Sequence, residues 1–252
     1  MVGRYFACLI LACGNFDFFA SKAGIENVRR NGEKDLDDPR VTSDRRASLK
    51  SKSLLTAIYN EWYGFIERHL PPGVNYGRVL ELGSGPGFMQ EVIPGIVTSE
   101  VLRVPFVDRM EDATALSYSD AELDALVMTD VLHHIPDLHT FFTEAQRVLR
   151  PGGRIICVEP WNTWWSRIIF RNFHHEPFVV GATSWKLPSG GPLSVANGAL
   201  PWIAFERDRD LFDSNFPQLD VLTTDVFMPL SYLMSGGFSY PQLVPGPPLR
   251  RG

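Results

Sequence analysis

The sequence predicts one α/β domain built on a mostly parallel, doubly wound sheet with helices on both faces. Three observations lead to this fold class. Strand-like and helix-like segments alternate between residues 53 and 160. Leu126, Val127 and Met128 stand in a row, as in a strand that is covered on both faces. A glycine-rich turn, ELGSGPG, directly follows another strand-like segment. The 252 residues are enough for one such domain with a full core.

The overall composition indicates a soluble globular protein with no general affinity for nucleic acid. Hydrophobic residues make up 44% of the chain and charged residues 21%, and the net charge is −5. A negative chain does not attract a phosphate backbone. The three cysteines, Cys8, Cys13 and Cys157, form no CxxC pair, so neither a disulfide framework nor a zinc site is indicated. These features favour a cytoplasmic location.

The first 42 residues are expected to form a partly flexible N-terminal arm. Its apolar run from Tyr5 to Cys13 is shorter than the roughly 20 residues of a spanning helix. The run loosely resembles a lipoprotein export signal, and it is also consistent with a packing helix or with a misassigned start. Residues 26–50 are polar and charged, which predicts a solvated arm.

The predicted domain spans residues 43–252, and its alternating strands and helices can be assigned in chain order. The spacing of apolar residues predicts a helix before Pro71, and Pro71-Pro72-Gly73 ends it. The further expected elements up to Pro160 are a strand over 78–82, a short helix from Phe88, a strand within 97–104, a strand from Asp124, a helix from Leu138 and a strand over 154–160.

Beyond Pro160 the alternation becomes irregular. An aromatic and basic stretch and a loop rich in Gly, Ser and Pro suggest a substrate lid over about residues 161–200. Pro201 is expected to begin a helix, and LDVLTTDVF is the last convincing strand, so a final strand is absent, degenerate or lost to truncation. Three roles remain as alternatives for the apolar tail from Met228: core packing, part of an acceptor pocket, and peripheral contact with a membrane surface.

Three known patterns of ligand-binding turn are candidates for the glycine turn. A phosphate-binding P-loop requires Gly-Lys-Ser/Thr at its end, but Phe88 follows Gly87. A dinucleotide fingerprint requires GxGxxG, which the even spacing of Gly83, Gly85 and Gly87 does not match. The remaining pattern is acid-x-Gly-x-Gly-x-Gly, and the segment from Glu81 to Gly87 fits it.

ELGSGPG resembles the first motif of class I S-adenosylmethionine-dependent methyltransferases, which have a Rossmann-like fold. TDVLHHIPDL and VLRPGGRIICVEP resemble later motifs of the methyltransferase type 11 group, and the resemblance covers about residues 45–160. It implies S-adenosyl-L-methionine as the cofactor. Glycines let the backbone lie against such a ligand, and the helix N-terminus behind the turn favours its carboxylate.

The resemblance also implies which residues hold the cofactor. Glu81 would lie near the methionine ammonium, Glu100 would accept from the ribose hydroxyls, and Asp112 would face the adenine amino group. A solvated strand-end acid and a turn acid remain the alternatives for Glu100 and Asp112. The complete expected cofactor set is Glu81, Gly83, Ser84, Gly85, Gly87, Glu100, Asp112, Ala113, Asp130, Val131 and His133.

Methyl transfer is an in-line displacement, so the protein mainly aligns the acceptor with the methyl group. An oxygen or nitrogen acceptor often needs a base, and histidine is suited to neutral pH. His174 and His175, with Glu176 as an orienting partner, are the expected acid–base residues. Packing remains the alternative for each histidine. No cysteine or suitably spaced further histidine completes a ligand set with the pair His133-His134, so no metal site is expected.

These observations predict an S-adenosylmethionine-dependent methyltransferase (EC 2.1.1) that acts on a small molecule, with lipid and glycan precursors among the acceptors considered. Tryptophans and arginines in 161–171 could close over an amphipathic or anionic acceptor, or could simply pack the lid on the sheet. A nucleic-acid methyltransferase would be expected to have a basic face and often an Asn/Asp-Pro-Pro-aromatic motif after the fourth strand. This chain has a negative net charge and the residues HHIP at that place, which disfavours this class. A methyltransferase-like protein that binds a cofactor or partner without catalysis, and more distantly a dehydrogenase, remain as alternatives. The sequence leaves the oligomeric state open.

Overall fold

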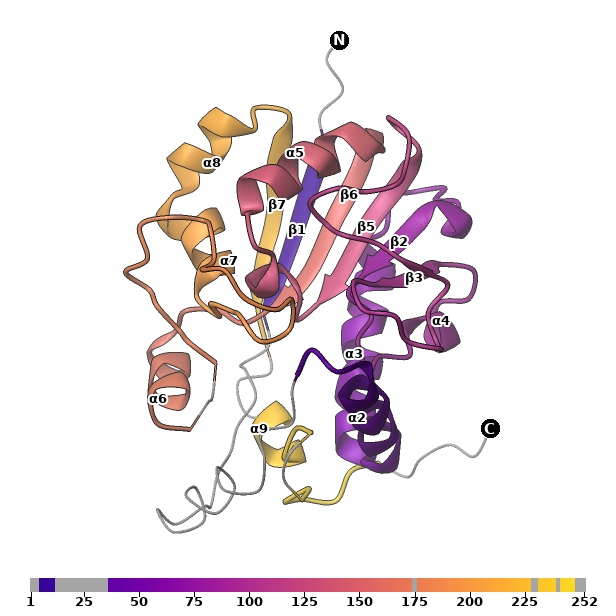
Figure 1. The fold of residues 1–252 in the computed structure, drawn as a ribbon, viewed down its shortest axis with the longest axis vertical. Helices are drawn as coiled ribbons and strands as arrows, with labels where there is room; N and C mark the ends of the chain where they lie inside the picture. The colour runs from indigo at the N-terminus through magenta and orange to yellow at the C-terminus, as the bar shows by residue number, and fades with distance from the viewer. Residues whose placement is uncertain (1–4, 12–35, 174–175, 228–230, 239–240, 248–252) are drawn as a thin grey trace.

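The computed structural model describes residues 5–11, 36–173, 176–227, 231–238 and 241–247. In these residues the chain forms a seven-stranded sheet in the order β4-β3-β2-β5-β6-β1-β7, and every pair of neighbouring strands is parallel (Figure 1). The strands are β1 (Tyr5–Leu11), β2 (Val79–Leu82), β3 (Val97–Glu100), β4 (Arg109–Met110), β5 (Leu123–Thr129), β6 (Leu149–Glu159) and β7 (Leu219–Val226).

Helices cover both faces of the sheet. The helices in the described residues are α2 (Pro39–Ser51), α3 (Ser53–His69), α4 (Met89–Val92), α5 (Leu138–Val148), α6 (Trp164–Phe173), α7 (Leu200–Trp202), α8 (Arg209–Asn215) and α9 (Ser231–Ser235), with the 3₁₀ turns η1 (Tyr76–Arg78) and η2 (Leu132–His134) and the π-helical segment η3 (Ile203–Arg207). The predicted Rossmann-like, doubly wound fold is therefore confirmed.

The core lies in two layers, one on each face. Leu126 and Met128 of β5 pack with α5 and α8, whereas Ala125 and Val127 pack with α3 and α4. Successive residues of a strand point to opposite faces. A continuous apolar run in β5 therefore serves both layers, which is why this strand lacks the polar alternation of a half-exposed strand.

The N-terminal apolar run is a strand, which corrects the packing-helix interpretation. β1 lies between β6 and β7, with Phe6 opposite Arg154 in one ladder and opposite Asp220 in the other. An interior parallel strand is apolar on both faces. A short apolar run of this kind cannot be assigned to helix or strand by periodicity alone.

The predicted boundary of the N-terminal arm at residue 42 falls inside α2 and is also corrected. Residues 39–51 form a helix, although they were expected to be part of a solvated arm. Asp38 caps the helix by accepting from the backbone N–H of Arg40 at 2.9 Å. Val41, Thr42 and Leu49 are buried. The helix thus gains stability from these tertiary contacts rather than from a strongly apolar sequence.

The end of the sheet agrees with the expectation that only one convincing strand follows the lid. β7 pairs with β1, and no strand follows it in the described residues. The region expected to form one helix from Pro201 is divided among α7, η3 and α8. No helix in the described residues combines the length and apolarity that crossing a bilayer requires.

Candidate active site

A cavity of about 360 Å³ lies at the carboxyl ends of β2, β3, β4 and β5. The chain moves outward from β2 to β3 and β4 and then returns to β5 on the other side of β2. Such a reversal of strand order leaves a crevice at the carboxyl ends of the central strands, where open α/β sheets bind ligands. The segments 81–86, 100–101, 111–113 and 129–131 line it from the sheet side.

The glycine turn presents bare backbone to this cavity. Gly83 and Gly85 have φ angles of 59° and 50°, a left-handed conformation that favours glycine. A Cβ on Gly83 would lie 2.6 Å from Cγ2 of Val131, whereas a Cβ on Gly85 would have no neighbour closer than 3.8 Å. Gly83 is therefore required for packing, and Gly85 leaves open space in which a ligand can approach the main chain.

Gly87 has a different role from the one expected. It is absent from the residues that line the cavity. A Cβ at this position would lie 2.5 Å from the hydroxyl of Tyr63. That hydroxyl accepts a hydrogen bond of 3.0 Å from the backbone N–H of Phe88. Gly87 thus lets α3 pack closely against the turn.

Glu81 is buried at the floor of the cavity, with 2% of its surface exposed. Its Oε2 accepts a hydrogen bond of 2.7 Å from the hydroxyl of Ser84. Burial raises the pKa of Glu81 to about 7, and the neighbouring charge of Glu100 adds to this effect. A cationic ligand group beside Glu81 would stabilise the carboxylate.

Glu100 ends β3 and also lines the cavity. Its Oε2 accepts from the N–H of Gly85 at 2.9 Å, and its Oε1 accepts from the N–H of Val101 at 2.8 Å. The side chain therefore ties the glycine turn to the neighbouring strand. Each carboxylate oxygen has a second lone pair that is able to accept from a ligand hydroxyl.

Asp112 and Ala113 line the cavity beyond β4. Oδ1 of Asp112 accepts from the backbone N–H of Thr114 at 2.8 Å and from its hydroxyl at 2.6 Å. These two bonds are those of a turn acid, the alternative interpretation. The contact of Asp112 with adenine stays a prediction.

The loop after β5 is held by a carboxylate that the sequence interpretation overlooked. Glu159, at the end of β6, is completely buried, and its Oε1 accepts from the N–H groups of Val131 at 2.8 Å and Leu132 at 2.7 Å. Its Oε2 lies 2.6 Å from Nδ1 of His133. The available signal was an acid directly after the apolar run Ile155–Val158 at the carboxyl end of β6, the end of a parallel strand where ligand-binding loops begin.

Asp130 is a further acid on the cavity wall and lies in the same loop. Its φ angle of 55° is unusual for a residue other than glycine. Burial raises the pKa of Asp130 to about 7, while the charge of His133 opposes that increase. Asp130 is thus another acid whose carboxylate a positively charged ligand would stabilise.

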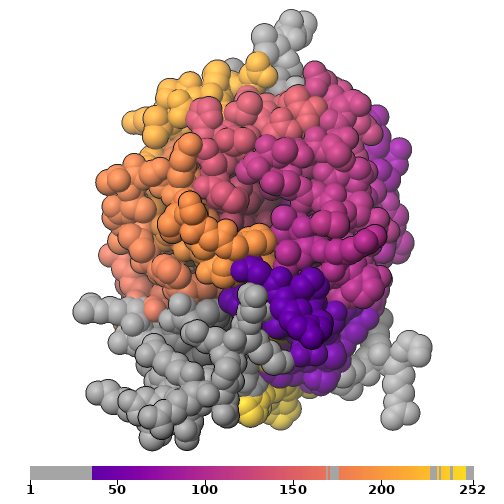
Figure 2. Space-filling model, viewed as in Figure 1, coloured from indigo at the N-terminus to yellow at the C-terminus, as the bar shows by residue number. Residues whose placement is uncertain are grey.

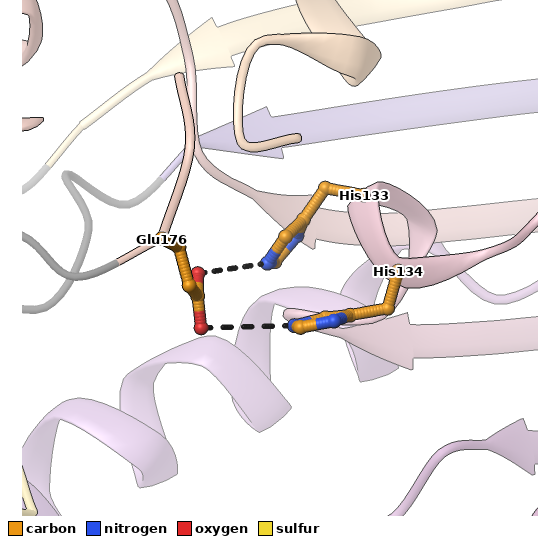
Figure 3. Close-up of side chains that lie close together, drawn as sticks. All are labelled: His133, His134 and Glu176. Carbon is orange, nitrogen blue, oxygen red and sulfur yellow. Dashed lines mark ion pairs between the residues drawn. The ribbon is translucent and has the colours of Figure 1, made fainter. Parts of the chain in front are cut away.

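His133, His134 and Glu176 converge in the lining of the cavity (Figure 3). Nε2 of His133 lies 3.5 Å from Oε2 of Glu176, and Nε2 of His134 lies 3.8 Å from Oε1. Burial and the charge of His133 lower the pKa of His134 to about 4. The pKa of His133 is raised, because the charges and hydrogen bonds of Glu159 and Glu176 outweigh the effect of burial.

Only part of the expected acid–base set can be placed. His174 and His175 lie outside the described residues, and Glu176 pairs with the other two histidines, His133 and His134. The convergence was not anticipated because the loop after β5 and the loop after α6 are distant in sequence. The fold, and not a local spacing pattern, brings them together.

The predicted lid contributes to the cavity wall through Phe170, Glu176, Gly190, Pro192 and Leu193. The backbone N–H of Leu193 donates to Asp37 at 2.8 Å, immediately before α2. In Figure 2 the orange surface of this loop meets the indigo surface of the α2 region. Residues of α2 and of the lid, which are far apart in sequence, thus line the same cavity.

The tryptophans expected in the lid do not line the cavity. Trp161 is buried in the core layer that contains α5, and Trp164 has 73% of its surface exposed. Arg167 donates to the side chain of Asn162 at 2.7 Å. Packing, which was the alternative interpretation, accounts for Trp161.

The residues present fit S-adenosyl-L-methionine on physical grounds. Three acids of raised pKa, Glu81, Glu100 and Asp130, surround bare backbone at Gly85. Burial of several acids costs free energy unless a cation or hydrogen-bond donors accompany them. A ligand with an ammonium, a sulfonium and ribose hydroxyls supplies both kinds of group.

Comparison with known proteins confirms the resemblance that the motifs predicted. Residues 80–157 match a family model described as a methyltransferase domain, which implies S-adenosyl-L-methionine as the cofactor. This segment contains the glycine turn, Glu100, Asp112 and the loop after β5.

Two curated relatives are methyltransferases. The chain is 31% identical over 160 residues to a 2-methyl-6-phytyl-1,4-hydroquinone methyltransferase of Synechocystis sp., which covers 56% of this chain and 48% of the relative. It is 39% identical over 56 residues to the ubiquinone/menaquinone biosynthesis C-methyltransferase UbiE of Bartonella bacilliformis, which covers 22% of each. The chain thus spans about half or less of the length of these relatives.

Among solved structures, the chain is similar to a protein of Methanococcus maripaludis described as a putative S-adenosyl-L-methionine-dependent methyltransferase. The TM-score is 0.40 and the sequence identity is 18%, and the alignment covers 51% of this chain and 67% of the other.

Proposed function

We propose that this protein transfers a methyl group from S-adenosyl-L-methionine to a small molecule that combines an apolar body with one ionisable hydroxyl or similar polar group. The observation that carries the proposal is the composition of the cavity at the switch point. Its lining combines acids and the bare backbone at Gly85 with the cluster of His133, His134 and Glu176.

The cofactor side would hold the methyl donor in a fixed orientation. Glu81 would accept from the methionine ammonium, and Glu100 would accept from ribose hydroxyls while it keeps the glycine turn in place. The cofactor supplies an activated methyl group when it is bound. The contribution of the chain is to orient that group and to shield it from water.

The acceptor side would bind the polar end of the second substrate. Because its pKa is lowered to about 4, His134 is neutral over the physiological range and can accept a hydrogen bond. Its Nδ1 donates to the carbonyl oxygen of Val195 at 3.0 Å, so the lone pair lies on Nε2. Glu176, which is partly exposed, offers a second proton acceptor nearby.

Apolar residues provide room for the body of the acceptor. Phe170, Pro192, Leu193 and Phe238 line the same cavity as the histidines. The relatives named above are methyltransferases of a phytyl hydroquinone and of ubiquinone/menaquinone biosynthesis, which supports an aromatic or lipid-like acceptor. Arg45 on α2 also lines the cavity and could pair with an anionic substituent.

A methyl-transfer assay over matched acceptors tests the proposal. Purified protein is incubated with S-adenosylmethionine labelled in the methyl group and with prenylated hydroquinones, their unprenylated parents and their fully O-methylated forms. We expect labelled product from the prenylated hydroquinones, less from the unprenylated parents and none from compounds without a free hydroxyl. Binding of S-adenosylhomocysteine without transfer to any acceptor would instead support a non-catalytic cofactor-binding protein.

A further inference from the structure

The cluster of His133, His134 and Glu176 has the geometry of an ion-binding site. One ligand atom from each residue can be chosen such that all three lie within 4.8 Å of one another. In Figure 3 both imidazole rings point toward the two oxygens of the same carboxylate. The sequence interpretation expected no metal site because no cysteine or further spaced histidine completes a ligand set, and it treated Glu176 only as a partner of His174 and His175.

The Nδ1 contacts of both histidines leave Nε2 of each ring directed toward Glu176. Nδ1 of His133 lies 2.6 Å from Oε2 of Glu159, and Nδ1 of His134 lies 3.0 Å from the carbonyl oxygen of Val195. A carboxylate or a carbonyl oxygen only accepts, so Nδ1 carries the hydrogen in both rings. Histidines that bind metals commonly donate their other ring N–H to such an oxygen.

The support for this arrangement is buried and rigid. Glu159 is completely buried, and it also accepts from the backbone N–H groups of Val131 and Leu132. The same carboxylate therefore fixes the backbone of η2 and the ring of His133. His133 is 2% exposed, so neighbouring side chains restrict its rotation.

The separations are close to those that one ion would impose. Bonds of about 2.0–2.1 Å to a tetrahedral ion place the ligand atoms about 3.3 Å apart. Nε2 of His133 lies 3.5 Å from Oε2 of Glu176, and Nε2 of His134 lies 3.8 Å from the other oxygen, Oε1. One ligand atom from each residue lies within 4.8 Å of the others, so the three side chains would draw closer together around a bound ion. All three residues line the cavity, so a ligand in the cavity could reach an ion held between them.

We infer that His133, His134 and Glu176 bind a divalent first-row transition-metal ion, with Glu159 as the positioning residue. Two imidazole nitrogens and one carboxylate oxygen suit Zn²⁺ and its neighbours in the row, whereas Ca²⁺ and Mg²⁺ require more oxygen ligands. Three protein ligands with one open position are typical of ions that bind a substrate oxygen. That last role rests on the proposed function, and the bound ion would then replace Nε2 of His134 and the carboxylate of Glu176 as the group that contacts the polar end of the acceptor.

The competing explanation needs no ion. A protonated His133 could donate from both ring nitrogens, to Glu159 on one side and to Glu176 on the other, and the cluster would then be a buried ion pair. The two explanations differ in one measurable respect. Only a metal site loses its affinity for Zn²⁺ when His134 is replaced, since His134 has no part in the proton bridge.

Calorimetric titration of the full, metal-stripped chain with ZnCl₂ and absorption spectroscopy with CoCl₂ test the inference. We compare the wild type with His134→Gln and Glu176→Gln, and with His139→Gln as a matched control, because His139 is exposed on α5 and is not part of the cluster. Circular dichroism and thermal unfolding establish that each variant is folded. Neither cofactor nor acceptor is present, so failure of the proposed methyl transfer does not affect the outcome.

We expect one Zn²⁺ per chain in the wild type and in His139→Gln, and an affinity at least about 100-fold weaker in the two cluster variants, beyond the range found for loss of a supporting residue alone. Co²⁺ should give the intense visible absorption of a four-coordinate site. Equal Zn²⁺ affinities in all four folded proteins, or no binding by the wild type, would overturn the inference in favour of the proton bridge.

Discussion

Glu81 shows how a single residue couples the fold to the ligand. The carboxyl group is 2% exposed and its one hydrogen bond from a side chain comes from Ser84. A buried carboxylate without a cation is unfavourable, which is why its pKa is raised to about 7 from 4.5. The folded protein therefore holds a proton on Glu81 under conditions in which the unfolded chain has released it.

Two opposite pH dependences follow from this residue. The unfolded chain loses the proton near pH 4.5 and the folded chain near pH 7, so the stability of the ligand-free protein falls as the pH rises through this window. The affinity for S-adenosylhomocysteine should rise over the same window, because the ammonium requires the carboxylate. Thermal unfolding and calorimetry at several pH values measure both.

Glu81→Gln provides the control for this prediction. Asp130 also has a pKa of about 7, so the wild type alone reports the sum of two groups. We expect the variant to show a smaller loss of stability with rising pH and a flatter affinity profile. Identical profiles in the two proteins would show that the charge of Glu81 does not matter for folding or binding.

At this scale the sequence located the acids and glycines that line the cavity better than the histidine cluster. Glu81 and Glu100 lie at the carboxyl ends of β2 and β3, and Gly85 lies in the turn after β2, so local order fixes their place at this edge of the sheet. Glu159 and the pairing of His134 with Glu176 depend on which loops the topology brings together. No periodicity in a single sequence reports such a contact.

Strand β1 is the element that most changes the expected architecture. It joins β7 to the remainder of the sheet, since β7 has no other partner in the strand order. Parallel pairing with a strand more than a hundred residues away could not be inferred from local patterns. By contrast, β2, β5 and α3 were predicted from the local spacing of apolar residues and from Gly and Pro residues that end the segments. Their observed bounds agree closely with the predicted ones.

A proline in β1 tests its structural role. Leu9 pairs with Cys157 on one side and with Thr224 on the other. Leu9→Pro removes a backbone N–H from the middle of an interior strand, and each unpaired group should cost about 1–3 kcal/mol in the free energy of unfolding. Urea unfolding measures the loss.

Leu9→Val is the matched variant, because it keeps the N–H and suits a strand. We expect its midpoint to stay close to that of the wild type while that of Leu9→Pro falls clearly. A proline variant as stable as the valine variant would contradict the position of β1 inside the sheet.

The whole molecule combines a negative net charge with a cavity whose acids lie inward. The net charge is −5, and Glu81, Glu100 and Asp130 line one wall. The sheet, two helical layers and a lid that contacts Asp37 together surround a cavity whose lining includes these acids and apolar residues of the lid. Acids that point inward would be stabilised by a ligand that carries a positive charge.

Calorimetric titration of the folded protein with S-adenosylhomocysteine tests the central claim most directly, with Gly85→Arg as the comparison. A side chain at Gly85 would enter open space in the cavity, so the variant should fold, with some strain from the left-handed backbone. We predict saturable binding at one site per chain in the wild type and its loss in the variant. A folded wild type that gives no binding, or a Gly85→Arg protein that binds equally well, would contradict the placement of the cofactor against this turn.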